Sequence, residues 1–246
     1  MTKDRLVLLS QHCGDCPIRH RAVCARCDAD ELRELEAVKY YQKFHAGQSV
    51  INAGERMEFV GSVVSGVATL TQTLEDGRTQ MVGLLLPSDF VGRPNRAHAA
   101  YDVVATTDLM MCCFRKAPFE KLLETTPHIT QRLLEMTLDE LDAAREWMLV
   151  LGRKTAREKI ASLLASIANR SNADAGAGCI SRQVFDLPIT REAMADYLGL
   201  TLETVSRQMS ALRREGVITL NGTRNVTVPD PTKLSAAAGN DAGIAV

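Results

Sequence analysis

Seven cysteines are the residues of this 246-residue chain whose type and spacing could do chemistry. Four lie near the N-terminus in the spacing Cys-x2-Cys-x7-Cys-x2-Cys, as Cys13, Cys16, Cys24 and Cys27. A pair two residues apart lets both thiolates reach one centre around a tight turn. In an intracellular protein this spacing favours metal or redox chemistry over disulfide bonds. The four thiols could hold a [4Fe–4S] cluster, hold a structural zinc ion, or stay reduced without a ligand.

The other three cysteines have less defined roles. Cys112 and Cys113 are adjacent on an expected β-strand. Successive side chains of a strand point to opposite faces, so only one of the two can point at the N-terminal segment. Cys179 is expected to be a lone thiol. An anionic group of thiolates needs cations nearby, and the Arg-His-Arg run at residues 19–21 can help to offset its charge.

Composition limits the class of protein. Apolar residues make up 46% of the chain and the net charge is −1, which rules out disorder over most of the length. No run of about 18 apolar residues is present, so no membrane-spanning helix is expected. The apolar residues that follow the charged N-terminus are too few for a signal peptide. We expect a soluble, cytoplasmic protein. No Ser/His/Asp set, Gly-rich phosphate loop or paired-carboxylate motif appears, which argues against an enzyme.

The elements that must position the cysteines change character along the chain. Between residues 37 and 125, short apolar stretches alternate with glycines, and Asp76-Gly77 between two apolar runs is a hairpin signal. This pattern predicts a small β-roll. The expected α+β organisation is a cysteine-rich segment at 1–36 that could bind a cluster or zinc, a β-roll at 37–125, a dimerisation helix at 126–152, a winged helix-turn-helix domain at 153–232 and a flexible tail at 233–246.

The spacing of apolar residues changes to that of a long helix over residues 126–152. Gly and Pro are absent between Ile129 and Leu151. Three leucines, then Arg145 and Met148, follow one another at alternating spacings of four and three. This stripe predicts that two chains meet along the helix, with packing against the chain's own roll as the alternative. Arg145 lies at the seam beside Glu146, so in a dimer like charges of the two chains would approach each other across the two-fold axis. We therefore expect a dimer of marginal stability. The expected dimerisation residues are Leu134, Leu138, Leu141, Arg145, Glu146 and Met148.

The C-terminal part predicts a DNA-reading unit. Residues 153–246 carry 12 Lys and Arg against 9 Asp and Glu, so this part of the chain is basic, whereas the remaining residues 1–152 carry 17 against 21 and are acidic. Residues 190–199 fit a short helix with Thr190 as N-cap, and residues 202–215 fit a second helix with Thr201 as N-cap. Two apolar stretches around Asn221-Gly222 then predict a hairpin, or wing. The alternative is a helical hairpin with an ordinary solvated face.

The outward face of the second helix has the chemistry to read bases. The N-terminal residues of such a helix meet base edges in the major groove. Arg207 can grip guanine O6 and N7, Glu203 can accept from a cytosine amine, and Ser206 can serve either partner. We also place Thr201, Ser210 and Arg213 in the DNA-binding set, and the basic residues there suit phosphates.

These motifs resemble one family. Residues 199–207 (GLTLETVSR), followed by Leu212, strongly resemble the recognition helix of the CRP/FNR superfamily of bacterial transcription regulators. The family's Glu-x-x-Ser-Arg signature falls on Glu203, Ser206 and Arg207. The resemblance implies a β-roll of the double-stranded β-helix, cyclic-nucleotide-binding type, a long dimerisation helix and a winged helix-turn-helix. Residues 44–48, 53–55 and 87–92 resemble parts of that β-roll, with Pro87 and Ser88 departing from the family's Gly-Asp-Phe-Ile-Gly turn.

The ligand-binding positions differ from those of cyclic-nucleotide members. Such members place Glu just after that turn and an Arg-Ser/Thr pair further on, to bind ribose and cyclic phosphate. This chain has Arg93-Pro94 at the first place and Ala99-Ala100-Tyr101-Asp102 around the second. A phosphate would meet the carboxylate of Asp102, so no cyclic nucleotide is expected.

The cysteine segment is similar to the FNR subfamily, in its FnrL/FnrN-type branch. The likeness covers the Cys-x2-Cys-x7-Cys spacing and residues 17–24 (PIRHRAVC). It implies a [4Fe–4S] cluster held by three N-terminal cysteines and one from the β-roll, and Cys27 is then an extra. The implied iron ligands are Cys13, Cys16, Cys24 and Cys112, with Cys113 as the alternative to Cys112.

The resemblance also implies a mechanism. The intact cluster favours a homodimer in the absence of oxygen, and oxygen breaks the cluster down and returns the chain to the monomer. The implied partners are a DNA site of the TTGAT-N4-ATCAA kind and RNA polymerase, in the control of anaerobic and microaerobic genes. Two alternatives stay open: a zinc-stabilised or redox-thiol regulator of the same family, and a small-molecule-binding β-roll that does not bind DNA.

Overall fold

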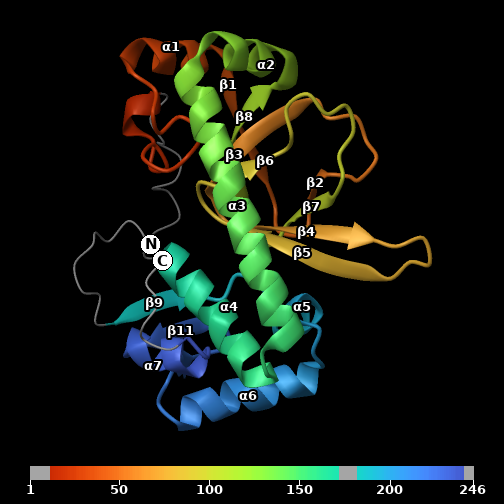
Figure 1. The fold of residues 1–246 in the computed structure, drawn as a ribbon, viewed down its shortest axis with the longest axis vertical. Helices are drawn as coiled ribbons and strands as arrows, with labels where there is room; N and C mark the ends of the chain where they lie inside the picture. The colour runs from red at the N-terminus through yellow and green to blue at the C-terminus, as the bar shows by residue number, and fades with distance from the viewer. Residues whose placement is uncertain (1–11, 172–181, 241–246) are drawn as a thin grey trace. The chain divides into compact units, whose positions relative to one another are not determined.

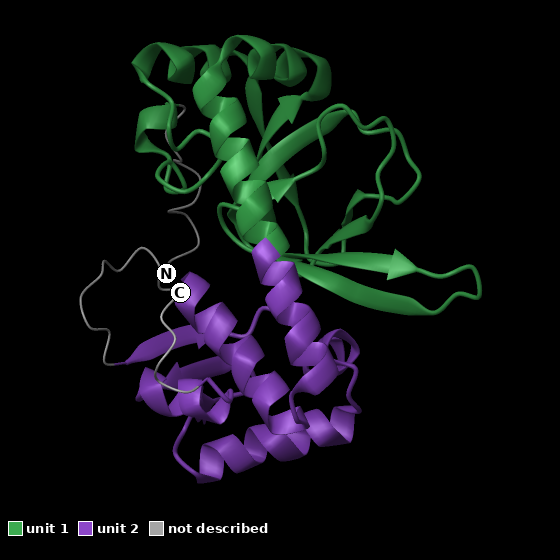
Figure 2. Cartoon of the chain, viewed as in Figure 1, with its two compact units in different colours: residues 1–141 green, residues 142–246 purple. Residues whose placement is uncertain are grey.

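The computed structural model describes residues 12–171 and 182–240. The chain divides into two compact units, residues 1–141 and 142–246, and the long helix α3 (Pro127–Arg153) runs through the boundary (Figure 2). No helix among the described residues is long and apolar enough to cross a membrane. The loop expected around residues 172–178, the thiol of Cys179 and residues 241–246 lie outside the described residues.

The expected β-roll is present as two four-stranded antiparallel sheets (Figure 1). The predicted hairpin at Asp76-Gly77 joins two paired strands of the second sheet, and Gly77 has the positive φ, +85°, that such a turn requires. The first sheet has the order β1 (Lys39–Phe44), β8 (Leu109–Arg115), β3 (Phe59–Ser65) and β6 (Phe90–Val91). The second has the order β2 (Ser49–Ile51), β7 (Asp102–Ala105), β4 (Ala68–Thr73) and β5 (Thr79–Leu85).

Strand β8 is buried on both faces. Its first six residues, Leu109 to Phe114, are all buried, as expected of a strand covered on both sides. Met111 and Cys113 belong to a core formed by side chains from both sheets. Cys112 belongs instead to a second core on the other face of the first sheet, which includes residues of the N-terminal segment and is called the outer core below.

The N-terminal segment covers that outer face. Besides the short 3-10 turn η1 (Cys13–Asp15), it contains a helix, α1 (Ala29–Val38), that the sequence analysis did not predict. A capping box starts α1, because the Asp28 carboxylate accepts from the amide of Glu31 and the Glu31 carboxylate accepts from the amide of Asp28. The expected boundary at residue 36 therefore falls inside a helix. Helix α2 (Lys116–Thr125) follows β8.

Helix α3 has two apolar faces in its N-terminal half. Ile129 is fully buried in the outer core, and Leu133 and Met136 pack against it. The predicted stripe lies on another face and stays exposed, with Leu134 at 59% and Leu138 at 51% exposed. The residues that contact the chain's own roll are thus different from those of the stripe.

The C-terminal unit contains the predicted helix-turn-helix and wing. The predicted boundaries of both helices hold to within one residue, but the predicted flexible tail at 233–246 is wrong in its first part. Pro231 to Ala237 form a helix, α7, that Asp230 caps and that buries Leu234. The elements are α4 (Ala156–Ser171), β9 (Gln183–Asp186), α5 (Arg191–Leu198), α6 (Leu202–Arg214), β10 (Thr219–Asn221), β11 (Asn225–Val228) and α7.

Candidate cluster site and nucleic-acid interface

One row of side chains crosses the first sheet beneath the N-terminal segment. Strand pairing places Tyr41 of β1 and Ser62 of β3 directly opposite Cys112 of β8, on its two sides. Directly paired residues project to the same face of a sheet. The three side chains therefore face the N-terminal segment together, whereas Cys113 points into the core between the sheets.

A small cavity of about 20 Å³ lies between this row and the N-terminal segment. The four thiols implied by the family resemblance all line it, three from the segment and one from β8. Neither Cys27 nor Cys113 lines it, although both are buried. Sequence reasoning missed Tyr41 and Ser62, whose place depends on strand register. The lining residues are Cys13, Cys16, Ile18, Ala22, Val23, Cys24, Leu35, Tyr41, Ser62, Cys112 and Phe114.

The four thiols of the cavity suit either candidate group by their chemistry. A zinc ion in a tetrahedral site has Zn–S bonds of about 2.3 Å, which places its four sulfurs about 3.8 Å apart. Within the described ranges, no three cysteine sulfurs lie within 4.8 Å of one another. Cysteine thiolates hold both kinds of group, so the metal and sulfide content of the protein distinguishes between them.

Burial raises the pKa of three of the cavity thiols, those of Cys13, Cys24 and Cys112, and so keeps them protonated. Desolvation raises the pKa of Cys24 to about 11, with the charge of Arg19 opposing the shift. Desolvation also raises the pKa of Cys112, and the neighbouring Cys16 adds to it. The Nζ of Lys39 donates a hydrogen bond to the Cys13 sulfur at 3.3 Å, and this contact opposes the rise that burial causes in the pKa of Cys13. A ligand that binds these sulfurs must displace their protons.

Arg19 fixes the shape of the cysteine loop. Its guanidinium donates to the carbonyl of Cys24 at 2.5 Å and to that of Cys27 at 2.7 Å. The sequence predicts that the cations at residues 19–21 offset thiolate charge. In the structure Arg19 also closes the loop that carries Cys24, through its bonds to the two carbonyls. His20 is exposed.

Polar contacts attach this loop to α3. Arg26, between Cys24 and Cys27, makes a two-bond ion pair with Glu135, with Nε–Oε2 at 2.9 Å and Nη2–Oε1 at 2.8 Å. Arg132 donates through Nη2 to the carbonyl of Arg21 at 2.8 Å and lies 3.3 Å from Glu135 through Nη1. The cysteine loop and the N-terminal half of α3 are thus held together by side chains of both.

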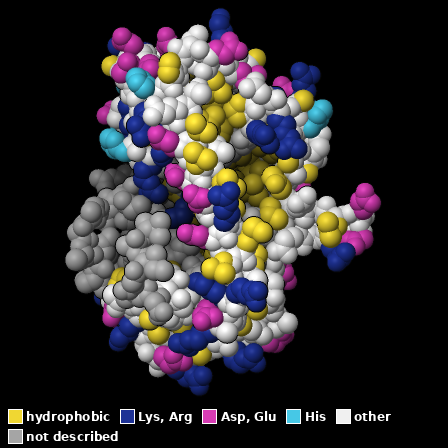
Figure 3. All heavy atoms as spheres, viewed as in Figure 1, with side chains coloured by type: hydrophobic (Ala, Val, Ile, Leu, Met, Phe, Trp, Pro, Cys, Tyr) yellow, Lys and Arg dark blue, Asp and Glu magenta, His cyan; other side chains and the backbone are white. Residues whose placement is uncertain are grey.

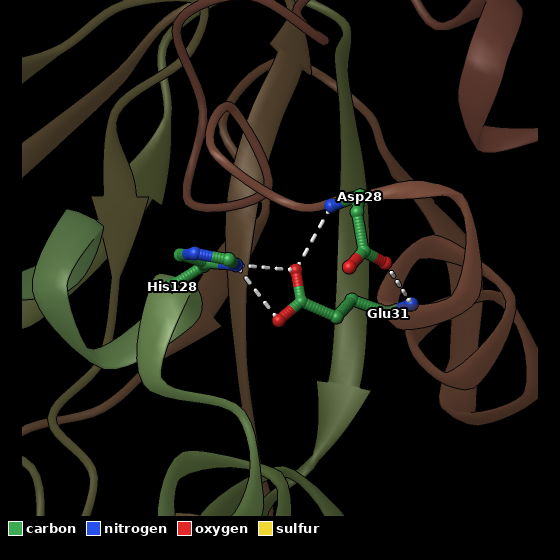
Figure 4. A group of neighbouring side chains, drawn as sticks. All are labelled: Asp28, Glu31 and His128. Atoms are coloured by element: carbon green, nitrogen blue, oxygen red, sulfur yellow. Dashed lines mark hydrogen bonds and ion pairs between the residues drawn. The ribbon is translucent and has the colours of Figure 1, made fainter.

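A third contact joins the start of α1 to the start of α3 (Figure 4). Both carboxylate oxygens of Glu31 lie 2.9 Å from Nδ1 of His128. Asp28, Glu31 and His128 lie close enough together to hold a metal ion. The carboxylates are already used, however, in the α1 capping box and the His128 contact. We therefore interpret the group as a structural contact that joins the start of α1 to the start of α3.

The helix-turn-helix presents the predicted reading face. The hydroxyls of Thr190 and Thr201 cap α5 and α6 by accepting from Ala193 and Thr204 amides, and Gly199 ends α5 in the left-handed conformation. Val205, Met209 and Leu212 are buried, so the opposite face of α6 is outward. Glu203, Arg207, Ser210 and Arg213 are exposed there, and Ser206 is half-buried.

Some of these groups also have structural work. Thr201 is exposed, but its hydroxyl is engaged in capping, and Ser210 donates to the carbonyl of Ser206 at 2.8 Å. The carboxylate of Glu203 accepts from its own amide and from Thr201, which lowers its pKa and keeps it charged. Arg157 of α4 pairs with Glu215 at the end of α6, with Nη1–Oε1 at 3.0 Å, and so holds that helix in its unit.

The predicted dimerisation stripe remains available along α3. Leu141 is 44% exposed and Met148 is 73% exposed. Arg145 forms an exposed ion pair with Asp142, with Nη1 and Oδ1 3.1 Å apart. Glu146 is exposed as well. Hydrophobic side chains gather on the face of the roll unit that Figure 3 presents.

The positions at which the sequence departs from cyclic-nucleotide-binding members of the family have local structural roles. The carboxylate of Asp102 accepts from the amide of Ala53 at 2.8 Å. In the turn that precedes β6, Ser88 has a φ of +81°, a conformation that favours glycine. Asp89 accepts from the amide of Leu86 at 2.8 Å and so stabilises the turn despite that departure.

Comparison with known families matches both halves of the chain. The Crp-like helix-turn-helix domain family matches residues 158–237. The cyclic nucleotide-binding domain family matches residues 41–126.

Individual relatives cover almost the whole chain. Transcriptional activator protein FnrL of Cereibacter sphaeroides is 67% identical over 241 residues, which are 98% of this chain and 97% of that protein. The fumarate and nitrate reduction regulatory protein of Salmonella typhi is 28% identical over 240 residues, 95% of this chain and 93% of that protein. The solved structure of FixK2 from Bradyrhizobium japonicum superposes with a TM-score of 0.71 at 30% identity, covering 85% of this chain and 100% of that chain.

Proposed function

The chain belongs to the FNR subfamily of the CRP/FNR superfamily of DNA-binding transcription regulators, and we propose that it is the subfamily's oxygen-responsive kind. One observation carries the proposal: cysteines far apart in the sequence line a single cavity. The proposed iron ligands are Cys13, Cys16, Cys24 and Cys112. Cys113 is disfavoured as the fourth ligand because it points into the core between the sheets.

The thiolates of Cys13, Cys16, Cys24 and Cys112 would hold a [4Fe–4S] cluster, and the cluster would supply a centre that oxygen breaks down. The chain supplies the enclosure. Leu35 and Phe114 exclude water from the cavity, and Arg19 holds the loop closed through its carbonyls. Without a bridge, the buried thiols are left protonated, as their raised pKa values require. The N-terminal segment then lacks this bridge and keeps its apolar packing and its surface contacts to α3.

The contacts to α3 are the means by which the segment affects dimerisation. Arg26, Arg132 and His128 tie the segment to the helix, and the same helix carries the exposed stripe of Leu134, Leu138 and Leu141. An ordered segment fixes the N-terminal half of α3. We infer that this favours a homodimer along the stripe, with Arg145, Glu146 and Met148 continuing it.

A dimer accounts for the DNA site. Two recognition helices about 34 Å apart read two half-sites one helical turn apart. In each half, Arg207 is proposed to grip guanine and Glu203 to accept from cytosine, with Ser206 beside them and Thr201, Ser210 and Arg213 nearer the backbone. The proposed operator is of the TTGAT-N4-ATCAA kind. Contact with RNA polymerase is proposed from family membership alone.

The test compares two adjacent cysteines. Wild type, Cys112→Ser and Cys113→Ser are purified without air, and iron, zinc and acid-labile sulfide are measured per chain. Operator binding is followed by fluorescence anisotropy before and after exposure to air. We expect iron and sulfide in wild type and Cys113→Ser, and a loss of both in Cys112→Ser, with operator binding lost on aeration.

Three results would contradict the proposal. Stoichiometric zinc without sulfide in the wild type would favour the zinc-stabilised alternative. A cluster that Cys113→Ser loses and Cys112→Ser keeps would reverse the choice of the fourth ligand. Operator binding that persists unchanged after the iron is lost would separate DNA binding from the cysteine site.

A further inference from the structure

One polar atom in the cysteine cavity has no partner. The hydroxyl of Ser62 is buried, with 1% of the residue exposed, and lines the cavity. It makes no hydrogen bond to any described part of the chain. A buried hydroxyl without a partner costs about 1–3 kcal/mol relative to one that is satisfied. Such a group is rare in folded proteins and calls for an explanation.

The position of Ser62 on its strand makes the hydroxyl conspicuous. Its neighbours on the same face, Val60 and Val64, are both buried in the outer core, where apolar packing is favoured. Ser62 lies between them and directly opposite Cys112. An aliphatic side chain would suit the packing equally well, so the hydroxyl is explained by an acceptor that occupies the cavity.

The geometry points to Ser62 as a hydrogen-bond donor to sulfur of the bound cluster, either a bridging sulfide or the thiolate of Cys112. This inference rests on the proposed function. Anionic sulfur accepts hydrogen bonds. Among the described residues that line the cavity with Ser62, the side chains that are not apolar are the cysteine thiols and the Tyr41 phenol. The hydroxyl rotates freely about its C–O bond, so it can follow whichever sulfur is nearest.

Such a donor stabilises the electron-rich sulfur and the Fe–S bonds that it forms. Hydrogen bonds to cluster sulfurs are one of the properties that set a cluster's potential. Loss of an outer-shell partner typically weakens metal binding by 10- to 100-fold. Ser62 is therefore a positioning residue that we expect to set how long the cluster survives in air.

The experiment uses the full chain with Ser62→Ala, Ser62→Thr and the control Ser65→Ala. Ser65 lies on the same strand but does not line the cavity. Iron and sulfide per chain are counted first, in protein purified without air. The loss of visible absorption is then followed in air-saturated buffer, and the metal-free forms are unfolded in urea.

For Ser62→Ala we expect a full cluster that is lost on the order of 10-fold faster than in wild type. Ser62→Thr keeps the hydroxyl and should lie within about 2-fold of wild type, as should Ser65→Ala. The metal-free Ser62→Ala protein should be as stable as wild type or more stable, because the substitution removes an unsatisfied hydroxyl.

The outcomes separate the inference from the proposed function. A wild-type protein without iron and sulfide would overturn the proposed function and this inference with it. A wild type with a full cluster, and a Ser62→Ala variant that loses its cluster no faster, would overturn the inference alone. A metal-free Ser62→Ala protein less stable than wild type would assign the hydroxyl a packing role and would also overturn it.

Discussion

The ion pair between Arg26 and Glu135 connects the cysteine loop to α3, and its strength can be worked out from its geometry. Two short bonds, at 2.9 and 2.8 Å, join the groups, and the side chain of Glu135 is only 29% exposed while that of Arg26 is 51% exposed. Exposed ion pairs contribute about 0.2–1 kcal/mol, with two-bond arginine pairs at the upper end. We expect a coupling energy of about 1 kcal/mol.

A double-mutant cycle measures this coupling. The free energy of unfolding is determined in urea for wild type, Arg26→Gln, Glu135→Gln and the double variant, by circular dichroism of the metal-free protein in 0.1 M NaCl. The coupling is the part of the two single effects that is not additive. Repeating the cycle in 1 M NaCl shortens the Debye length from about 10 Å to about 3 Å and should reduce the coupling.

Arg33 and Asp30 provide the matched control. They also form an ion pair, within α1, but both side chains are more than 70% exposed. Their coupling should be about 0.3 kcal/mol, as for other pairs three residues apart on a helix. If the coupling of Arg26 with Glu135 proves no larger than that of the control, the loop is not held to α3 by this pair and our account of communication between them is wrong.

Three further predictions concern the stripe, the reading helix and pH. Leu138→Glu should abolish the homodimer in sedimentation equilibrium, because it places like charges at the seam. Leu74→Glu, on the β4–β5 hairpin with the same 51% exposure, should leave the dimer intact; equal behaviour of the two would argue against the stripe. Arg207→Ala should cost about 1–3 kcal/mol at one base pair in competition binding, whereas Arg213→Ala should weaken all sequences alike and reduce the salt dependence of binding by about one ion. Finally, the pKa of Cys24 is raised from 9.0 to about 11. Because the unfolded chain releases this proton first, the metal-free protein should lose stability from pH 9 to about pH 11. The slope of unfolding free energy against pH should be smaller in Cys24→Ala, and an unchanged slope would count against the burial of this thiol.

Local chemistry in the sequence predicted the reading unit well. Thr190 and Thr201 cap their helices as expected, because a hydroxyl next to a free amide needs no long-range information. The same kind of signal was present for α1 and α7, two of the helices that the sequence analysis missed. Asp28-x-x-Glu31 is a capping box before α1, and Asp230-Pro231 is a cap followed by a favoured first residue before α7. The Ala- and Gly-rich composition after Leu234 obscured the second.

The cavity depends on contacts that spacing along the chain does not contain. The alternation of a strand shows that Cys112 and Cys113 face opposite ways, but not which of them meets the N-terminal segment. That choice follows from which core lies on each side of β8. Tyr41 and Ser62 enter the site only through the register of β1 and β3 with β8. No pattern near either residue marks it as part of a cysteine site.

The contacts between the segment and α3 are suited to a switch because they are weak. The Arg26 and His128 pairs are partly exposed, and together with the bond from Arg132 to the Arg21 carbonyl they contribute at most about 3 kcal/mol. That equals the upper end of typical coupling between sites, about 150-fold in an equilibrium constant. A dimer stabilised by much more than this would stay paired whatever the state of the cysteines. In the proposed homodimer, the exposed stripe is interrupted by Arg145, which would keep dimerisation within the range that such contacts can control.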